Sequence, residues 1–212
     1  MRNKTKKFVE FSASAFSIEA KNPDAKIRLE KLFAQYPKIT LELGCGRGEY
    51  TIGLAEKYPN ELFIGVDIQG ERLWSGAKRA ADLKLTNVCF FRCLIDKLAL
   101  FIPEKSIKAI WLTFPDPFPK EKHFKRRLTY RKYLLFYQKI LKKYGVINLK
   151  TDSPKLSEFT KKEVAFLHGE ILTDISNIYE KQFNKENIYI TTCFEQRQLQ
   201  RDCTIKFLSF HF

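Results

Sequence analysis

One carboxylate in the sequence lies between two prolines and is followed by a dense run of cations. Residues 112–127 read LTFPDPFPKEKHFKRR, with Asp116 between Pro115 and Pro117. Proline fixes φ and restricts the residue before it, so this stretch predicts a stiff loop that aims the carboxylate. A carboxylate held beside aromatic rings suits a planar hydrogen-bond donor such as a nucleobase, which stacks on the rings while its N–H groups meet the oxygens.

The cations after this loop suit a polyanion. They are Lys120, Lys122, Lys125, Arg126 and Arg127. Side chains of this kind beside a base pocket could hold the phosphates around an extruded nucleotide. Four more cations are expected to extend the patch: Arg131, Lys132, Lys142 and Lys143. A proline turn with Asp116 as a helix cap, next to a solvated lysine-rich face, is the alternative that the residue types leave open.

A second candidate site is the glycine-rich turn in LELGCGRGEY. Its glycines are Gly44, Gly46 and Gly48. Glycine permits unusual backbone angles and lets a ligand approach the main chain. Glu42 precedes the turn, and Asp67 follows about 20 residues later, where a ribose hydroxyl pair needs an acceptor. Pyrophosphate at the next helix start would meet Glu49, so a cofactor without phosphate and with a cationic end, such as S-adenosylmethionine, fits better. A tight turn in which Glu42 pairs locally is the alternative.

These candidate residues fall at the ends of predicted strands. We expect strands at 38–43, 61–68, 87–94, 107–114, 145–151 and 204–212. We expect helices at 49–58, 70–85 and 130–144, the last one ending at Gly145. A further helix begins with Ser153 as N-cap and Pro154 at its first position. Alternation of apolar strands with helices predicts an α/β fold, with a parallel sheet whose sites lie beyond the carboxyl ends of the strands.

Composition predicts one domain over residues 1–212, in which residues 1–36 form a basic, helical N-terminal extension. No apolar run is long enough to span a bilayer, and no secretion signal is evident. The five cysteines are odd in number and scattered, which favours reduced thiols in a cytoplasm over disulfides or a metal site. The net charge of +14 favours a polyanionic partner.

The sequence resembles the bacterial tRNA (guanine-N7)-methyltransferase family. The motifs that carry the resemblance are LELGCGRG, GVDIQ, FPDPFPKEKHFKRRLTY, LKTD and TCFEQR, in this order along most of the chain. The resemblance implies a Rossmann-like class I methyltransferase fold with a mostly parallel, seven-stranded sheet and an antiparallel C-terminal strand. It implies S-adenosylmethionine as methyl donor, no metal, and tRNA as partner, with N7 of guanosine 46 in the variable loop as the acceptor. We expect a cytoplasmic monomer or homodimer without membrane attachment.

The resemblance also implies residue roles. Cofactor contacts would be Glu42, Gly44, Gly46, Gly48, Asp67, Cys93 and Asp116. Substrate contacts would be Lys120, Asp152, Thr192, Phe194 and Glu195, and Arg126 and Arg127 would hold the RNA. Asp116 would be the catalytic residue, where cofactor and base meet. The family often has an acid where Cys93 stands, and Asp96 is the alternative for that contact.

Guanine N7 carries a lone pair and no proton, so its methylation needs no general base. Catalysis would come from placement of the base and from a carboxylate that offsets the positive charge growing on the ring. Three other functions compete. Exocyclic amino-methyltransferases use an N/D-P-P-aromatic loop, which has a different proline spacing. A non-catalytic RNA-binding module would need neither the glycine turn nor Asp67. A nicotinamide enzyme is disfavoured by Glu49, which would repel the pyrophosphate.

Overall fold

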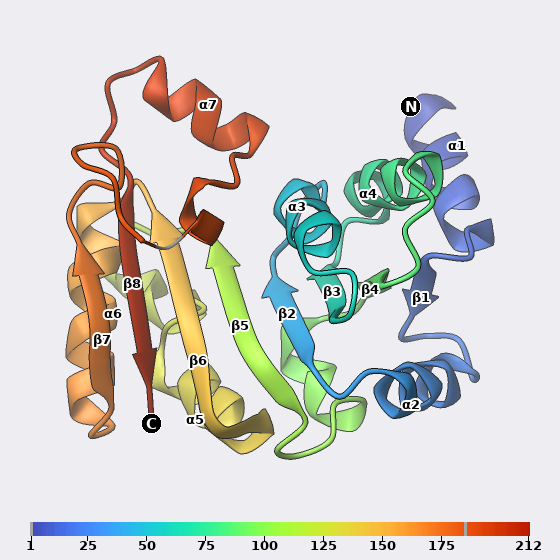
Figure 1. Cartoon of the computed structure of the whole chain (residues 1–212), viewed down its shortest axis with the longest axis horizontal. Coiled ribbons are helices and arrows are strands. Elements are labelled where there is room, and N and C mark those ends of the chain that lie inside the picture. Colours follow the sequence, from blue (N-terminus) through green and yellow to red (C-terminus); the bar gives the residue numbers. More distant parts are fainter. Residues whose placement is uncertain (1, 185) are drawn as a thin grey trace.

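The computed structural model describes residues 2–184 and 186–212, and its strands form a single mixed sheet. Its strands are β1 (Ser17–Glu19), β2 (Ile39–Leu43), β3 (Leu62–Asp67), β4 (Val88–Arg92), β5 (Ile107–Thr113), β6 (Leu141–Thr151), β7 (Glu170–Ile175) and β8 (Lys206–His211). They lie in the order β1-β4-β3-β2-β5-β6-β8-β7 (Figure 1). The first six strands pair in parallel, whereas β8 is antiparallel to both β6 and β7. The predicted α/β sheet with an antiparallel C-terminal strand is confirmed.

Helices cover both faces of the sheet. They are α1 (Arg2–Ala13), α2 (Ala25–Gln35), α3 (Glu49–Lys57), α4 (Gly70–Asp82), α5 (Arg131–Ile140), α6 (Pro154–Phe166) and α7 (Cys193–Leu199), with 3-10 turns η1 (Ile95–Leu100), η2 (Glu121–Arg126) and η3 (Glu186–Tyr189). Alternate strand residues point to opposite faces. Leu41 and Leu43 therefore join a core with α2, α5 and α6, whereas Phe63 and Trp111 join a second core with α1, α3 and α4. In the part of the chain that the structure describes, no helix combines the length and apolarity needed to cross a bilayer.

The sheet has eight strands, one more than the seven that the resemblance implies, and β1 and β7 are the two that the six expected ranges do not include. β1 arises within the segment predicted to be a basic, helical extension, and it pairs in parallel with β4 through Ile18 and Phe91. Glu19 is buried at the end of this strand, where its carboxylate lies 3.0 Å from the Arg92 guanidinium and also accepts a hydrogen bond from Ser12. Three residues are too few to show strand periodicity, so pairing with a neighbour, not local pattern, defines β1.

The helix predicted to end at Gly145 is shorter than expected. α5 ends at Ile140, and Leu141 already pairs with Ile107 as the first residue of β6. An irregularity in the β5–β6 pairing follows, and Tyr144 takes a left-handed backbone with φ of 64°. The prediction was wrong because the apolar spacing of the helix continues to Leu141, whose side chain is buried by strand pairing instead.

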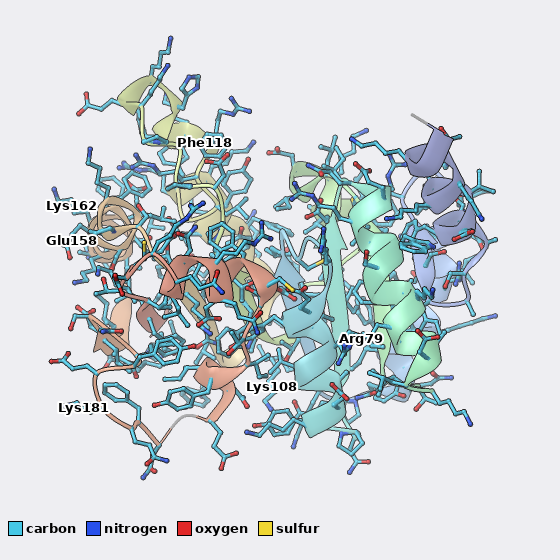
Figure 2. The ribbon with its side chains drawn as sticks, turned by 90° about the horizontal axis from the view of Figure 1, so that it is seen from above. Arg79, Lys108, Phe118, Glu158, Lys162 and Lys181 are labelled. Atoms are coloured by element: carbon cyan, nitrogen blue, oxygen red, sulfur yellow. The ribbon has the colours of Figure 1, made fainter. Side chains whose placement is uncertain are left out.

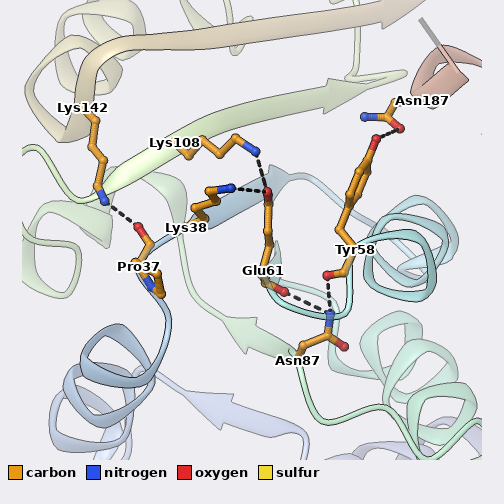
Figure 3. Close-up of polar contacts among 8 residues, drawn as sticks. All are labelled: Pro37, Lys38, Tyr58, Glu61, Asn87, Lys108, Lys142 and Asn187. Atoms are coloured by element: carbon orange, nitrogen blue, oxygen red, sulfur yellow. Dashed lines mark hydrogen bonds and ion pairs between the residues drawn. The ribbon is translucent and has the colours of Figure 1, made fainter.

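Two of the expected patch cations lie at the opposite edge of the sheet from its carboxyl ends. Lys142 is the second residue of β6 and donates a hydrogen bond from Nζ to the carbonyl oxygen of Pro37, at 2.6 Å (Figure 3). Lys108 lies 2.7 Å from Glu61 at the same amino edge of the sheet (Figure 3). Lys142 and its neighbour Lys143 therefore do not extend the basic patch that follows Asp116.

The start of α6 agrees with the sequence. Ser153 is its N-cap and accepts a hydrogen bond from the backbone N–H of Leu156 at 3.2 Å, and Pro154 is the first helical residue. This cap places Asp152 between the end of β6 and the helix, at the carboxyl edge of the sheet.

Candidate functional site

The glycine turn after β2 has a backbone that only glycine adopts readily. Gly44, Gly46 and Gly48 have φ of 75°, 57° and 72°. A Cβ on Gly48 would lie 2.2 Å from the Phe90 ring, whereas a Cβ on Gly46 would meet nothing within 4 Å. Gly48 is thus required by the packing beneath the turn, and Gly46 leaves the main chain open to a ligand above it.

Asp67 connects this turn to the end of β3. Its Oδ2 accepts a hydrogen bond from the N–H of Gly46 and its Oδ1 accepts one from the N–H of Gln69, both at 2.9 Å. A carboxylate oxygen accepts more than one hydrogen bond, so both oxygens keep capacity for a ligand hydroxyl. This is the position at which the sequence predicts a ribose acceptor.

Glu42 lies beneath the turn as a buried carboxylate. It accepts hydrogen bonds from the Thr51 N–H at 2.8 Å and from the hydroxyls of Thr51 and Thr113. Burial raises its pKa to about 7, although the hydrogen bonds from the two threonines act in the opposite direction. Its oxygens hold α3 and the end of β5, and the group is partly ionised near neutral pH.

The raised pKa of Glu42 predicts that Glu42→Gln stabilises the protein at pH 8. The folded-state pKa of about 7 exceeds the ordinary value of 4.5, so the free energy of unfolding falls as pH rises through this window. Neutral glutamine does not suffer this loss and still suits the threonine partners. We expect a gain of about 2 kcal/mol at pH 8 and little gain at pH 5, measured by thermal unfolding of both proteins. A gain of equal size at both pH values would contradict the assigned pKa.

Two strained residues flank Asp116 in the loop after β5. Phe114 and Phe118 have φ of 49° and 40°, which is an uncommon conformation for bulky side chains. Asp116 itself is exposed, and its Oδ1 accepts a hydrogen bond from the N–H of Phe118 at 2.9 Å. Strained backbone is typically retained at ligand-binding positions. The loop therefore holds a defined carboxylate with its second oxygen directed to no partner among the described residues.

Arg127 turns inward and holds this loop. Its Nε donates to the carbonyl oxygen of Pro117 at 2.9 Å and its Nη2 to that of Phe118 at 3.0 Å. Its guanidinium lies 4.4 Å from the Phe159 ring centre, and only 7% of the residue is exposed. The prediction that Arg127 holds RNA disagrees with this position, because a run of cations does not reveal which one faces the interior.

The other predicted cations remain at the surface. η2 projects outward from one side of the sheet, with Phe118 near its base (Figure 2). Lys120, Lys122, Lys125 and Arg126 are exposed on and around this turn. The Arg126 guanidinium lies 4.7 Å from the Phe118 ring centre. We define these four cations as the η2 patch.

Two cations of α5 form ion pairs with carboxylates and therefore add little to the η2 patch. Arg131 forms an ion pair with Glu163 at 2.9 Å, and Lys132 forms one with Asp96. Asp96 also accepts a hydrogen bond from the Tyr133 hydroxyl at 3.3 Å. The carboxylate of Asp96 is therefore directed toward α5, away from the position considered for it beside the cofactor.

Cys93, the alternative to Asp96, lines a separate cavity of about 340 Å³. Burial raises the pKa of its thiol to about 11, so the group is neutral at physiological pH. Ile68 and Leu94 line the same cavity and remain 49% and 47% exposed. Sequence reasoning missed these two apolar residues. Their signal is that each lies within two residues of a strand end at the carboxyl edge, where an exposed apolar side chain suits the face of a planar ring.

A cavity of about 380 Å³ brings the glycine turn, the end of β5 and the start of α7 together. It is lined by Glu42, Gly44, Cys45, Gly46, Arg47, Glu49, Arg72, Thr113, Phe114, Thr192, Cys193, Phe194 and Arg197. The Cys193 N–H donates to Glu49 Oε2 at 2.7 Å, so the start of α7 covers the start of α3. Pyrophosphate at the start of α3 would meet the Glu49 carboxylate, which already accepts the N–H at the start of α7, and this disfavours a dinucleotide.

The predicted substrate residues near α7 divide into two groups. Phe194 lines the cavity, with its ring centre 5.1 Å from that of Phe114. Thr192 caps α7 by accepting a hydrogen bond from the N–H of Glu195 at 3.1 Å. The Glu195 carboxylate is fully buried against Lys150 and therefore faces away from solvent. Of the three predicted residues, Phe194 presents its ring to the cavity, Thr192 lines it while capping α7, and Glu195 is buried behind it.

Asp152 and Lys120 have accessible polar groups. Asp152 is half-buried at the end of β6, and its carboxylate has no hydrogen bond or ion pair within residues 2–184 and 186–212. Lys120 is exposed at the start of η2. Both could meet a substrate that enters from the carboxyl edge. No three metal-ligating side chains among the described residues form a cluster able to hold an ion.

Comparisons with known proteins identify the family. A model described as "Putative methyltransferase" matches residues 36–208. A tRNA (guanine-N(7)-)-methyltransferase of Porphyromonas gingivalis is 45% identical over 81% of this chain and 70% of its own length. One of Mycoplasmopsis pulmonis is 35% identical over 90% of this chain and 97% of its own.

Solved structures agree on the fold. The 16S rRNA methyltransferase KamB aligns with a TM-score of 0.68 at 14% identity, over 91% of this chain and 96% of its own. An antibiotic-related methyltransferase aligns with a TM-score of 0.63 at 23% identity, over 87% and 92%. At these identities the likeness shows a shared methyltransferase fold. Together with the sequence relatives, it shows that the chain belongs to the tRNA (guanine-N(7)-)-methyltransferase family.

Proposed function

We propose that this protein transfers a methyl group from S-adenosylmethionine to N7 of a guanine in tRNA, at guanosine 46 of the variable loop. The observation that carries the proposal is the position of Asp116. The Asp116 carboxylate is exposed on a strained loop. This loop continues from Thr113 and Phe114, which line the cavity beside the glycine turn, and it leads into the η2 patch. The names of the relatives support guanine N7 and tRNA. The choice of guanosine 46 rests on the resemblance, and we expect the protein to act in the cytoplasm.

The residues around the glycine turn fit the proposed cofactor. Open space above Gly46 admits a ligand, and Asp67 offers oxygens to the ribose hydroxyls. Ile68 and Leu94 offer apolar surface to the adenine, with Cys93 beside them. When bound, S-adenosylmethionine supplies an electrophilic methyl group on a cationic sulfur. The carboxylates of Glu42 and Asp67 lie below and beside the turn, where negative charge suits the cationic sulfur.

Guanine N7 bears no proton, so the protein has to position the guanine for methyl transfer and does not have to remove a proton from it. The second oxygen of Asp116 would accept a hydrogen bond from the N–H edge of guanine and offset the positive charge that develops on the ring. Phe114 and Phe194 offer ring faces for stacking, and Asp152 is the candidate second acceptor. The η2 patch would bind the phosphates around the base.

The proposal is tested by incubating the protein with labelled S-adenosylmethionine and unmodified tRNA, followed by mass spectrometry of the nucleosides. We expect 7-methylguanosine, and we expect none when guanosine 46 of the tRNA is replaced by adenosine. A product methylated on an exocyclic amine would instead favour the amino-methyltransferase alternative. RNA binding without S-adenosylmethionine binding in calorimetry would favour a non-catalytic module.

Removal of charge from the η2 patch is expected to weaken tRNA binding in a salt-dependent way. Three phosphate contacts release counterions, so Lys122→Ala/Lys125→Ala/Arg126→Ala should reduce the slope of log affinity against log salt by about 2 to 3. Filter-binding titrations at several salt concentrations measure this slope. The matched control, Lys139→Ala/Lys142→Ala/Lys143→Ala, removes three cations near the amino edge. An equal change of slope in both variants would contradict a localised contact.

A further inference from the structure

A fully buried ion pair lies between the sheet and the segment that leads into α7. Lys150 and Glu195 are both 0% exposed, and the Lys150 ammonium lies 2.7 Å from the Glu195 carboxylate. The ammonium also donates to the carbonyl oxygen of Ile190 at 3.0 Å. The Tyr179 hydroxyl donates to Glu195 at 2.8 Å. Both charged groups are thus fixed by direct hydrogen bonds.

Lys150 connects the two segments that line the mouth of the cavity. Its carbonyl oxygen accepts a hydrogen bond from the N–H of Phe114 at 2.8 Å, at the start of the Asp116 loop. Its ammonium lies 5.9 Å from the Phe114 ring centre and, through Glu195, holds the segment that carries Phe194. The contact between the Phe114 and Phe194 rings therefore depends on one residue of β6.

A buried ion pair carries a large desolvation cost in this position. Removing two charges from water offsets much of their attraction, and well-packed apolar residues are often at least as stable. Burial lowers the pKa of Lys150, in keeping with this desolvation. What this pair adds is a fixed geometry, because one ammonium must donate to the Glu195 carboxylate and to the Ile190 carbonyl at the same time. This favours a role in geometry over a role in stability.

We propose that the Lys150–Glu195 pair sets the position of the 190–195 segment against the Asp116 loop, and that Glu195 is a positioning residue without contact to the base. The inference rests on the proposed function for its effect on methyl transfer. It differs from the role that the family resemblance implies for Glu195, because the carboxylate oxygens are already bound to Lys150 and Tyr179. Phe194 is then the residue of this segment that meets the substrate.

Alkylation of Cys193 tests the position of the segment without any use of RNA. Cys193 is exposed beside Phe194, Cys203 is half-exposed, and the other three cysteines are buried. In a Cys203→Ser background, we expect Glu195→Gln to raise the rate of iodoacetamide labelling at Cys193 at least fivefold. We also expect it to lower kcat/KM for tRNA at least tenfold. Mass spectrometry of the labelled peptide and single-turnover methyl transfer give the two values.

The control is Glu163→Gln, which breaks the Arg131–Glu163 pair elsewhere in the same domain. It should lower Tm without changing Cys193 labelling. Lost activity in Glu195→Gln with labelling unchanged would overturn the proposal, since Glu195 would then contact the base directly. Labelling that rises equally in both variants would also overturn it. If the wild type methylates no tRNA, the proposed function fails, whereas the labelling result still decides the role of the ion pair.

A double variant covers the case in which the single change prevents folding. Lys150→Met/Glu195→Met replaces both charges, so no unpaired charge stays buried and the chain should fold, although the Ile190 carbonyl and the Tyr179 hydroxyl each lose a hydrogen bond. We expect its kcat/KM for tRNA to remain at least tenfold reduced, because the apolar pair packs without fixing direction. Wild-type kcat/KM in this variant would overturn the proposal.

Discussion

Replacement of Asp116 by Asn is expected to lower the rate of methyl transfer by at least about 100-fold, the range seen when one electrostatic group is removed from an active site. Asparagine keeps the shape of the side chain and can still accept the hydrogen bond from the Phe118 N–H. It removes the negative charge that would offset the cationic ring. Single-turnover assays with saturating S-adenosylmethionine measure the loss.

Cofactor affinity separates this effect from general damage. We expect calorimetry to give a dissociation constant for S-adenosylmethionine within about threefold of the wild type in Asp116→Asn, because the glycine turn and Asp67 are untouched. Asp96→Asn is the matched control, since this exposed acid pairs with Lys132 of α5. Its rate should be close to that of the wild type. Equal losses in the two variants would indicate that the charge of Asp116 has no specific role.

The second large effect is expected from Arg127→Met, which keeps an apolar stem but removes the guanidinium. Two hydrogen bonds from a charged donor to the carbonyls of Pro117 and Phe118 are lost, and these two oxygens are left in a partly buried loop. A loss of about 3 kcal/mol in the free energy of unfolding is expected. The strained Phe118 is no longer held, so kcat should fall about tenfold or more as Asp116 loses its defined position.

Arg126→Met provides the contrast at the next residue. Arg126 is exposed and lies over the Phe118 ring, so its loss should raise KM for tRNA while kcat and Tm stay near the wild-type values. Steady-state kinetics and thermal unfolding of the two variants measure this difference between neighbouring arginines. The same kinetic pattern in both variants would show that Arg127 does not act through the loop.

The sequence predicts those parts of the fold that depend on local chemistry. Glycines that require left-handed backbone, Ser153 as a cap and apolar strands that end in functional residues all appear where expected. The errors arise where the secondary structure of a segment depends on the strand with which it pairs. Leu141 fits a helical pattern but is buried by Ile107 across the sheet, and β1 is defined by β4 because three residues show no period.

The candidate site shows the same division. Asp116, Asp67 and the glycine turn are brought to one edge of the sheet, as parallel strand order requires. The directions of Arg127 and Glu195 could not be predicted, because each depends on distant partners, namely Phe159 and Lys150. Sequence gives the types of the charged residues, whereas packing determines which of them remain available to a ligand.

The central claim is that Asp116 directs a methyl group to guanine N7 without acting as a proton acceptor. The most direct test is single-turnover transfer to unmodified tRNA at pH 6 to 9, with the product nucleoside identified by mass spectrometry. We predict 7-methylguanosine from both wild type and Asp116→Asn, a rate at least about 100-fold lower in the variant, and the same pH profile for the two proteins, since Asp116 does not act as a base. A different methylated nucleoside, or equal rates for the two proteins, would contradict the claim.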